Sequence, residues 1–148
     1  MSMLVLPLSS SYTVKMYKVG LICLFLALIG CLSQDFITRR FKVGIEYENS
    51  LPMSGRSDRY RHKNNYDPFF VSVTATAKKN YVISYIEVKA SVDATGDVEF
   101  NLISGQTGSR QIVFQLVSNQ SDFLSYSYLV YGIKEDEYKK VQESLNVS

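Results

Sequence analysis

The feature that most constrains this chain is a series of short segments, from Phe69 to Tyr131, in which apolar residues recur at every second position. Each segment is rich in β-branched or aromatic residues, and turn-forming residues separate it from the next. Strands at a spacing of about eight to twelve residues are typical of antiparallel sandwiches and small barrels. The strands expected on this basis are residues 69–77, 81–90, 98–104, 111–118 and 123–131.

Two further segments complete the expected fold. Residues 36–48 alternate poorly at first and then predict a strand around Val43–Tyr47. Residues 134–145 have acidic residues early, lysines later and apolar residues at helical spacing, which favours a short C-terminal helix or tail within residues 134–148. The predicted fold class is all-β, a small antiparallel sandwich or meander barrel of about six or seven strands.

Between the first expected strand and the next, residues 49–68 are rich in Ser, Gly, Pro, Asn, Arg and Asp. This composition predicts a long polar loop, of a length that is unusual in a compact domain and that indicates either a mobile or a functional segment. The basic residues of this loop suit either an anion-binding site or a site of proteolytic processing, and the alternative is a solvated loop without a ligand. They are Arg56, Arg59, Arg61 and Lys63.

The N-terminal region predicts a secretory signal peptide over residues 1–33, followed by a single domain over residues 34–148. Residues 19–32 contain no charge, Lys15 and Lys18 precede them, and the small residue Ser33 follows. We expect cleavage between Ser33 and Gln34. The apolar run is shorter than the roughly 20 residues that a membrane-spanning helix needs, so we expect a secreted, extracellular protein without a stable membrane anchor.

Other readings of this region stay open. The apolar run would also suit a signal anchor that remains in the membrane, and Leu28–Cys31 resembles the lipidation signal of bacterial lipoproteins. Translation starting at Met16 would give a more compact signal peptide than translation starting at Met1.

Cleavage would change the composition of the working domain. Both cysteines, Cys23 and Cys31, precede the cleavage site, so the mature domain would have no disulfide and would depend on its core. Loss of Lys15 and Lys18 would leave fourteen basic and fourteen acidic residues. A neutral domain gives no reason to expect a nucleic-acid partner.

No constellation of residues predicts catalysis. The only histidine, His62, lies among cations in the polar segment rather than in a setting that would orient it for a serine nucleophile. Residues 105–109 lack the lysine of a phosphate-binding loop and predict a hairpin turn instead. The acids Asp93, Asp97 and Glu99 do not have calcium-ligand spacing. We therefore expect no enzyme, no metal and no cofactor.

Two features bear on modification and binding. Asn119 and Asn146 each begin an N-glycosylation sequon. The chain also holds eleven tyrosines and eight phenylalanines, most of which are expected to pack on the sheets. Some of them would suit the lining of a small apolar pocket, which gives the hypothesis of a carrier for an apolar ligand.

Five segments carry a family resemblance by their order and spacing, and they are residues 42–46, 82–86, 104–108, 112–118 and 130–132. Together they span about 90 residues, from Val43 to Gly132, and resemble the insect multiprotein bridging factor 2 family, whose members are also called probable salivary secreted peptides. The resemblance departs from the family pattern where Ser104 replaces the first of two glycines and where residues 119–122 replace a glycine-rich turn.

The resemblance implies two alternative roles. The family's founding member was described as a transcriptional co-activator, whereas many relatives carry signal peptides and are similar to secreted proteins. With the predicted signal peptide, the expected function is that of a secreted, non-enzymatic insect protein that acts by binding an unknown protein. The alternatives are the carrier of a small apolar ligand and the transcriptional co-activator.

Overall fold

The computed structural model describes residues 8–31, 35–62 and 67–147, and the chain divides into two compact units, Met1–Asp35 and Phe36–Ser148. The first unit contains helix α1 (Leu8–Cys31). Within the described part of the chain, no helix combines the length and the apolar character that crossing a bilayer requires. The predicted cleavage residues Ser33 and Gln34 lie outside the described residues.

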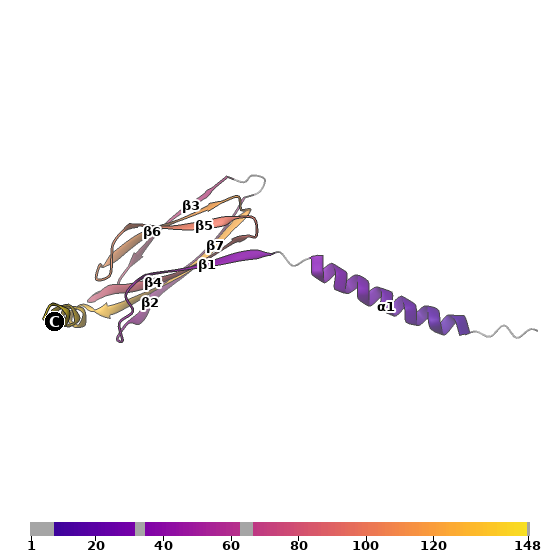
Figure 1. Cartoon of the computed structure of the whole chain (residues 1–148), viewed down its shortest axis with the longest axis horizontal. Coiled ribbons are helices and arrows are strands. Elements are labelled where there is room, and N and C mark those ends of the chain that lie inside the picture. The colour runs from indigo at the N-terminus through magenta and orange to yellow at the C-terminus, as the bar shows by residue number, and fades with distance from the viewer. Residues whose placement is uncertain (1–7, 32–34, 63–66, 148) are drawn as a thin grey trace, which may run out of the picture. The chain divides into compact units, whose positions relative to one another are not determined.

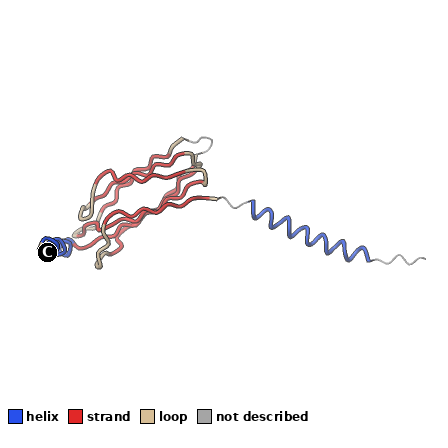
Figure 2. Tube along the Cα trace, in the orientation of Figure 1, coloured by secondary structure: helices blue, strands red, loops and turns tan. Residues whose placement is uncertain are grey.

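The second unit is a β-sandwich of seven antiparallel strands in two layers, with a helix after the last strand (Figure 1 and Figure 2). The four-stranded sheet has the order β1-β4-β7-β2, and the three-stranded sheet has the order β3-β6-β5. This confirms the predicted all-β class, as a sandwich rather than a barrel. The elements are β1 (Phe36–Gly44), β2 (Leu51–Arg61), β3 (Phe69–Thr76), β4 (Tyr81–Asp93), β5 (Asp97–Ser104), β6 (Gln111–Asn119), β7 (Phe123–Lys134) and α2 (Glu135–Asn146).

Alternation along the strands decides which side chains enter the core. Successive side chains of a strand point to opposite faces, and in β3 every second residue is buried. The same rule buries Ile112, Phe114 and Leu116 of β6 and Ile86 and Val88 of β4. The apolar residues at every second position, which predicted these strands, therefore form the inward face of each sheet.

A chain of aromatic rings fills the space between the two sheets. Phe41 of β1 stacks on Phe100 of β5 with ring centroids 5.3 Å apart, and Phe100 stacks on Phe114 at 5.3 Å. Phe114 then meets the edge of the Tyr128 ring at 5.8 Å. The Phe41–Phe100 and Phe114–Tyr128 contacts each join one sheet to the other, and the Phe100–Phe114 contact links them within the three-stranded sheet, so the aromatic residues hold the two layers together.

The connections between strands are those of a sandwich and not those of the meander barrel, which was the alternative expectation. Only β5 and β6 are both consecutive in the chain and paired with each other, whereas β4 pairs with β1 and β7 and β6 pairs with β3 and β5. The turns after Asp93 and after Asn119 cross from one sheet to the other instead of closing hairpins. Such a crossing buries the apolar face of each strand against the opposite sheet, which a flat meander would leave exposed.

Strand β1 lies earlier than the expected strand around Val43–Tyr47. It pairs with β4 along its whole length, from Phe36 opposite Asp93 to Gly44 opposite Tyr85. Because β1 is an edge strand, one face remains polar and the apolar alternation is weak. Gly44, at a positive φ of 107°, ends the strand.

The predicted loop over residues 49–68 is also wrong, because β2 occupies most of it. β2 pairs with β7 from Leu51 opposite Gly132 to Arg61 opposite Phe123. Most of its side chains are exposed on both faces, so it has no apolar alternation by which to recognise it. Its backbone hydrogen bonds to β7, rather than its composition, make it a strand.

Helix α2 confirms the prediction for residues 134–145 within one residue at each end. Acidic residues occupy its first turn, where their negative charge interacts favourably with the positive end of the helix dipole. Tyr138 anchors the helix to the sandwich: its hydroxyl donates a hydrogen bond to the carbonyl oxygen of Thr107 over 3.3 Å, and its ring meets Tyr47 edge-on with centroids 6.2 Å apart.

Candidate functional site

The residues of the predicted basic loop lie on strand β2, so their side chains alternate between two faces. Arg56 lies opposite Tyr128 of β7 and faces the space between the sheets. Arg59 and Arg61 fall on the opposite, outward face. Lys63 lies outside the described residues. The structure therefore separates cations that the sequence alone placed in one loop.

The two outward arginines contact residues at the start of β7. Arg61 Nε lies 3.4 Å from Oδ2 of Asp122, and the Arg59 guanidinium lies over the Phe123 ring at 5.0 Å from its centroid. Exposed ion pairs and cation–π contacts of this kind contribute little stability, but they fix where the side chains lie.

On the inward side of β2, Arg56, Asp58 and Tyr60 form a polar cluster at the open edge of the sandwich. Arg56 Nη2 lies 3.7 Å from Oδ2 of Asp58, and the Tyr60 hydroxyl donates a hydrogen bond to the same oxygen over 3.4 Å. The backbone N–H of Arg59 donates to Oδ1 of Asp58 over 2.8 Å. Asp58 is thus surrounded by donors, while the exposed guanidinium of Arg56 has further N–H donors to offer a ligand.

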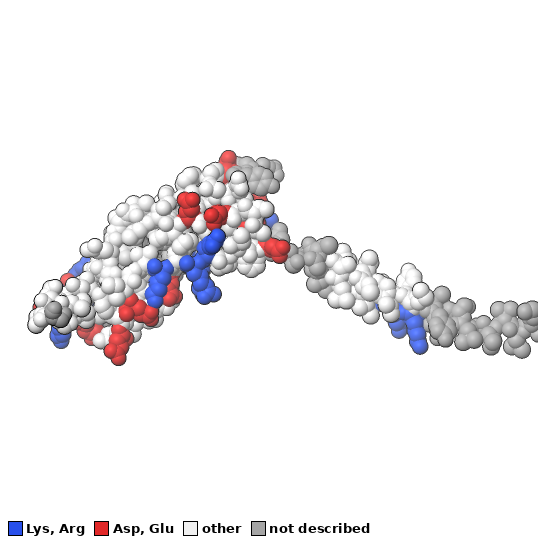
Figure 3. Space-filling model, viewed as in Figure 1, with Lys and Arg blue, Asp and Glu red and all other residues white. Residues whose placement is uncertain are grey.

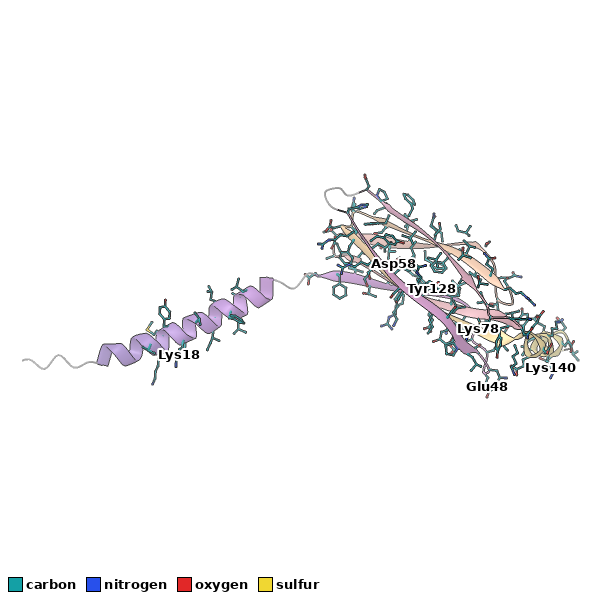
Figure 4. All side chains as sticks on the ribbon, turned by 180° about the vertical axis from the view of Figure 1, so that it is seen from behind. Lys18, Glu48, Asp58, Lys78, Tyr128 and Lys140 are labelled. Carbon is teal, nitrogen blue, oxygen red and sulfur yellow. The ribbon has the colours of Figure 1, made fainter. Side chains whose placement is uncertain are left out.

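This cluster lines a groove of about 320 Å³, called here the edge groove, between β2 and the edge strand β3. The Tyr60 ring stacks on Tyr126 with centroids 6.3 Å apart and the planes 8° from parallel. Asp58 and Tyr128, on neighbouring strands, mark this part of the molecule in Figure 4. The lining residues are Arg56, Tyr60, Ser72, Val73, Thr74, Tyr126 and Tyr128.

The chemistry of the edge groove is that of hydrogen bonding and stacking. Burial, together with the neighbouring Tyr60 and Asp58, raises the pKa of Tyr126 to about 12. Its hydroxyl is therefore neutral at physiological pH and acts as a hydrogen-bond donor or acceptor. A guanidinium, phenol hydroxyls and aromatic faces can recognise a polar ligand, but nothing in the groove activates a nucleophile.

A second cluster, on the outward face of the four-stranded sheet, was not predicted from the sequence. The Tyr85 and Tyr131 rings stack with centroids 4.2 Å apart, and Lys42 Nζ lies 4.5 Å from the centroid of the Tyr85 ring. Lys42 also forms a 2.6 Å ion pair with Glu46, which raises the pKa of Lys42 and lowers that of Glu46. Burial raises the pKa of Tyr85. The cluster is internally paired and has a structural role.

His62 is held by its neighbours rather than set beside a nucleophile. Its ring stacks on Phe69 with centroids 3.9 Å apart, and its Nε2 lies 2.8 Å from the carbonyl oxygen of Asp67. Its backbone N–H donates to the carbonyl oxygen of Asp122 over 2.9 Å. These contacts give the ring a packing role where β2 leads toward β3.

The turns that resemble ligand sites have structural explanations. Gly105 and Gly108 both adopt positive φ, which confirms a hairpin turn between β5 and β6. Asp93 Oδ2 accepts a 2.6 Å hydrogen bond from the Asp122 N–H, and Asp97 Oδ1 lies 3.7 Å from Arg39. Among the described residues, no three His, Cys, Asp or Glu side chains form a group that could hold a metal ion.

The glycosylation candidates lie at ends of secondary structure. Asn119 is the last residue of β6 and is exposed, and Asn146, also exposed, is the last residue of α2. The hydroxyl of Ser121, which completes the first sequon, is buried and donates to the carbonyl oxygen of Phe123 over 2.6 Å. Both asparagine side chains are thus accessible in the folded domain, and their modification stays a prediction.

Comparison with known families identifies the sandwich. The family model described as Transcription activator MBF2 matches residues 54–132, more than half of the chain. The match begins within β2 and ends within β7, so it includes every strand except β1. It is not an enzyme family. No curated protein and no solved structure matches the chain. The resemblance noted in the sequence is confirmed, and the chain belongs to the MBF2 transcription activator family.

Proposed function

We propose that this chain is a secreted, non-enzymatic protein that acts by binding, and that its binding site is the edge groove, which accepts an extended polypeptide segment beside β3. The observation that carries the proposal is the unequal size of the two sheets. The four-stranded sheet has one strand more than the three-stranded sheet, and the edge groove is lined by β2 and β7 of the larger sheet and by β3, an edge strand of the smaller sheet.

Strand β3 has a free edge that is unusually open to pairing. It is hydrogen-bonded only to β6, and its eight residues contain no charge, no proline and no break in register. Edge strands expose unpaired backbone N–H and C=O groups, and proteins normally protect them with charges, prolines or bulges. The absence of these devices in β3 makes it suited to receive another strand.

The other three edge strands have such protection. β1 carries Arg39, Arg40 and Lys42. β2 has an irregularity between Pro52 and Ser54 together with several charged residues. β5 carries two acidic residues and an irregularity near its end. The contrast favours β3 as the edge on which a partner binds.

The edge groove also limits the partner. A strand added beside β3 would direct every second side chain toward Arg56 and Tyr60 of the overhanging strand β2. Arg56 favours a carboxylate or amide oxygen there, and the Tyr60–Tyr126 stack favours a flat or short side chain. The proposed ligand is therefore an extended segment with acidic or amide residues at alternate positions.

Secretion is supported by the division of the chain. The sandwich begins at Phe36, close behind the predicted cleavage site after Ser33, and forms a compact unit with its own core. Removal of the preceding residues would leave every strand in place. The carrier alternative is less well supported, because aromatic and aliphatic side chains fill the described interior.

The first experiment tests secretion against the co-activator role that the family description suggests. The full chain with a C-terminal tag is expressed in insect cells, and the protein in the medium and in nuclei is measured. We expect it in the medium, with Gln34 at its N-terminus. Recovery of the uncleaved chain in nuclei would overturn the secreted role and support the co-activator role.

The second experiment tests the binding site. A photo-crosslinking residue replaces Ser72 in the edge groove or, as the control, exposed Asn101 on the far edge strand β5. We expect the photo-crosslinking residue to attach to a second polypeptide more often at position 72 than at position 101. Thr74→Lys should reduce this attachment, because a lysine on an edge strand opposes pairing. Equal crosslinking from both positions would contradict the proposal.

A further inference from the structure

The outward face of the four-stranded sheet carries a regular array of hydroxyls and cations. The register of the sheet places residues of all four strands side by side in rows that cross the strands. One row contains three hydroxyl side chains and one cation, and the hydroxyls of its first two members lie 2.8 Å apart. Across β1, β4, β7 and β2, this row is Thr38, Ser91, Ser125 and Arg59.

The neighbouring row repeats this composition with more charge. It places two cations directly opposite each other on β1 and β4, followed by two serines on β7 and β2. Together the two rows hold three cations, five hydroxyls and no carboxylate, and they are called here the basic face. Across the same strands, the second row is Arg40, Lys89, Ser127 and Ser57.

The opposed pair Arg40 and Lys89 has no structural explanation. Like charges directly opposite each other on neighbouring strands destabilise a sheet. Both side chains are exposed, and neither forms an ion pair with a carboxylate of the described residues. By contrast, Lys42, in the next row, is paired with Glu46 and lies opposite Glu87. Glu87, the carboxylate nearest to this pair along β4, lies opposite Lys42 instead, so Arg40 and Lys89 are suited to an external anion.

Two shallow grooves shape this surface. One, of about 280 Å³, lies between β1 and β4 and is lined in part by Arg40 and Lys89. The other, of about 250 Å³, lies between β4 and β7 and is lined in part by Lys89 and Ser127. Both share Lys89 and Glu87, so the grooves are neighbours and cross the sheet. A linear ligand lying in them would cross several strands and pass Arg40 and Lys89.

We propose that the basic face binds a sulfated linear polysaccharide. Neighbouring strands are about 4.8 Å apart, so one anionic group can be shared by Arg40 and Lys89, while Arg59 lies about three strand spacings away on β2. The serines between these cations match a stretch of ligand with hydroxyls rather than charge. Sulfate groups carried on hydroxyl-bearing rings are the chemistry of a sulfated glycan.

In Figure 3, the Lys and Arg atoms on the sandwich lie mainly along the layer that contains β1, where Asp and Glu atoms lie beside them, while the layer of β3, β5 and β6 shows few charged atoms. A polyanion would thus meet its counter-charges on one side of the sandwich. The basic face is separate from the edge groove, because the side chains that β2 and β7 contribute to the groove point inward from the same sheet. The proposal goes beyond the proposed function and shares with it only the expectation of an extracellular setting.

Binding is tested with protein purified after expression of the full chain. The probes are heparin, fully desulfated heparin and vesicles containing phosphatidylserine, with affinity measured at low and at physiological salt. We expect heparin to bind more tightly than either of the other probes, with an affinity that falls as salt increases. No binding of heparin at low salt would overturn the proposal, and so would equal binding of the desulfated chain. Tighter binding to the vesicles would point to a lipid surface instead.

Matched variants locate the site. Arg40→Ser/Lys89→Ser should weaken heparin binding by at least about tenfold, whereas Lys139→Ser/Lys140→Ser on α2 removes the same charge and should weaken it far less. Equal weakening would show that net charge alone is responsible. The thermal midpoint gives an independent control: removing a like-charged pair should leave it unchanged or raise it. These binding results do not depend on where the protein is secreted, so failure here and failure of the proposed function are distinguishable.

Discussion

The two sheets of the sandwich share one core but have very different outer chemistry. The strands of the four-stranded sheet contain eight of the chain's lysines and arginines and six of its tyrosines. The strands of the three-stranded sheet contain no lysine, arginine, histidine or tyrosine, and their only charged residues are Asp97 and Glu99. Alternation makes this possible, because the inward residues build the core and leave the outward residues free to differ.

The difference assigns a separate kind of recognition to each sheet. The larger sheet presents side chains, the cations and hydroxyls of its basic face, which suit an anionic ligand. The smaller sheet presents backbone, the uncharged free edge of β3, which suits an added strand. The core between them is common to both, so a change in the core should affect both kinds of site, whereas a change on one outer face should leave the other sheet intact.

The largest effect is expected from Phe114→Ala, which removes the ring that contacts both sheets. Phe114 is fully buried, stacks on Phe100 and meets Tyr128 of the opposite sheet. Truncation of a buried phenylalanine to alanine costs about 3–5 kcal/mol, a large part of the stability of a domain of this size. Urea unfolding measures the loss. Ile103→Ala, at a site 58% exposed, is the control and should change stability by less than about 0.5 kcal/mol.

The next effect should be confined to the four-stranded sheet. Gly44 ends β1 at a φ of 107°, and a Cβ there would collide with the carbonyl oxygen of Ser84 in β4. Gly44→Ala should therefore lower the free energy of unfolding by about 1–3 kcal/mol. Hydrogen exchange should show the loss of protection at the β1–β4 pairing before the three-stranded sheet is affected. An unchanged exchange rate in β1 would show that the turn relaxes without strain.

The sequence predicted all three strands of the smaller sheet and, in the larger sheet, β4 and β7, whereas β1 was displaced and β2 was missed. β3, β5 and β6 were located within about one residue, because strands that cover a core on one side show clear alternation. β2 was missed because its outward and inward residues are both polar. Its inward set, Arg56, Asp58 and Tyr60, does recur at every second position, and that spacing is the signal that a polar strand leaves in a sequence.

The sites depend on neighbours that no single segment reveals. The edge groove requires β2 to lie beside β7 and β3 to lie across from both, and these pairings join residues far apart in the chain. The like-charged pair Arg40 and Lys89 likewise exists only in the register of β1 with β4. Tyr85 points outward yet is buried, because Lys42 and Glu46 contact it. Composition and periodicity predict strands but not which strands are neighbours.

The tyrosines of the larger sheet predict a loss of stability in alkali. Burial raises the pKa of Tyr126 to about 12, so between pH 10 and 12 the unfolded chain loses this proton while the folded chain keeps it. Its contribution to stability is present below pH 10 and is lost as the pH rises toward 12. The slope from one such group is at most about 1.4 kcal/mol per pH unit. The raised pKa of Tyr85 acts in the same direction.

Tyr126→Phe should therefore make the unfolding midpoint in urea less sensitive to pH above 10. The urea midpoint is measured at pH 8 and at pH 11 for the variant and for the original protein, and the slope compared is the change in midpoint between these two pH values. A slope equal to that of the original protein would show that Tyr126 does not carry the effect. Since no strand of the smaller sheet contains a tyrosine, the alkaline transition should begin in the larger sheet.

The smallest effect concerns one buried hydroxyl in each sheet. The Oγ atoms of Ser84 in β4 and Ser118 in β6 are buried without a hydrogen-bond partner among the described residues. A buried hydroxyl without a partner is destabilising, so Ser118→Ala should raise the free energy of unfolding by about 0.5–1 kcal/mol. Ser121→Ala is the matched control, because the Ser121 hydroxyl binds Phe123 and the N–H of Asp93. That variant should lose stability. If Ser118→Ala also loses stability, the hydroxyl has a partner such as a bound water, and the interior between the two sheets is less apolar than its side chains indicate.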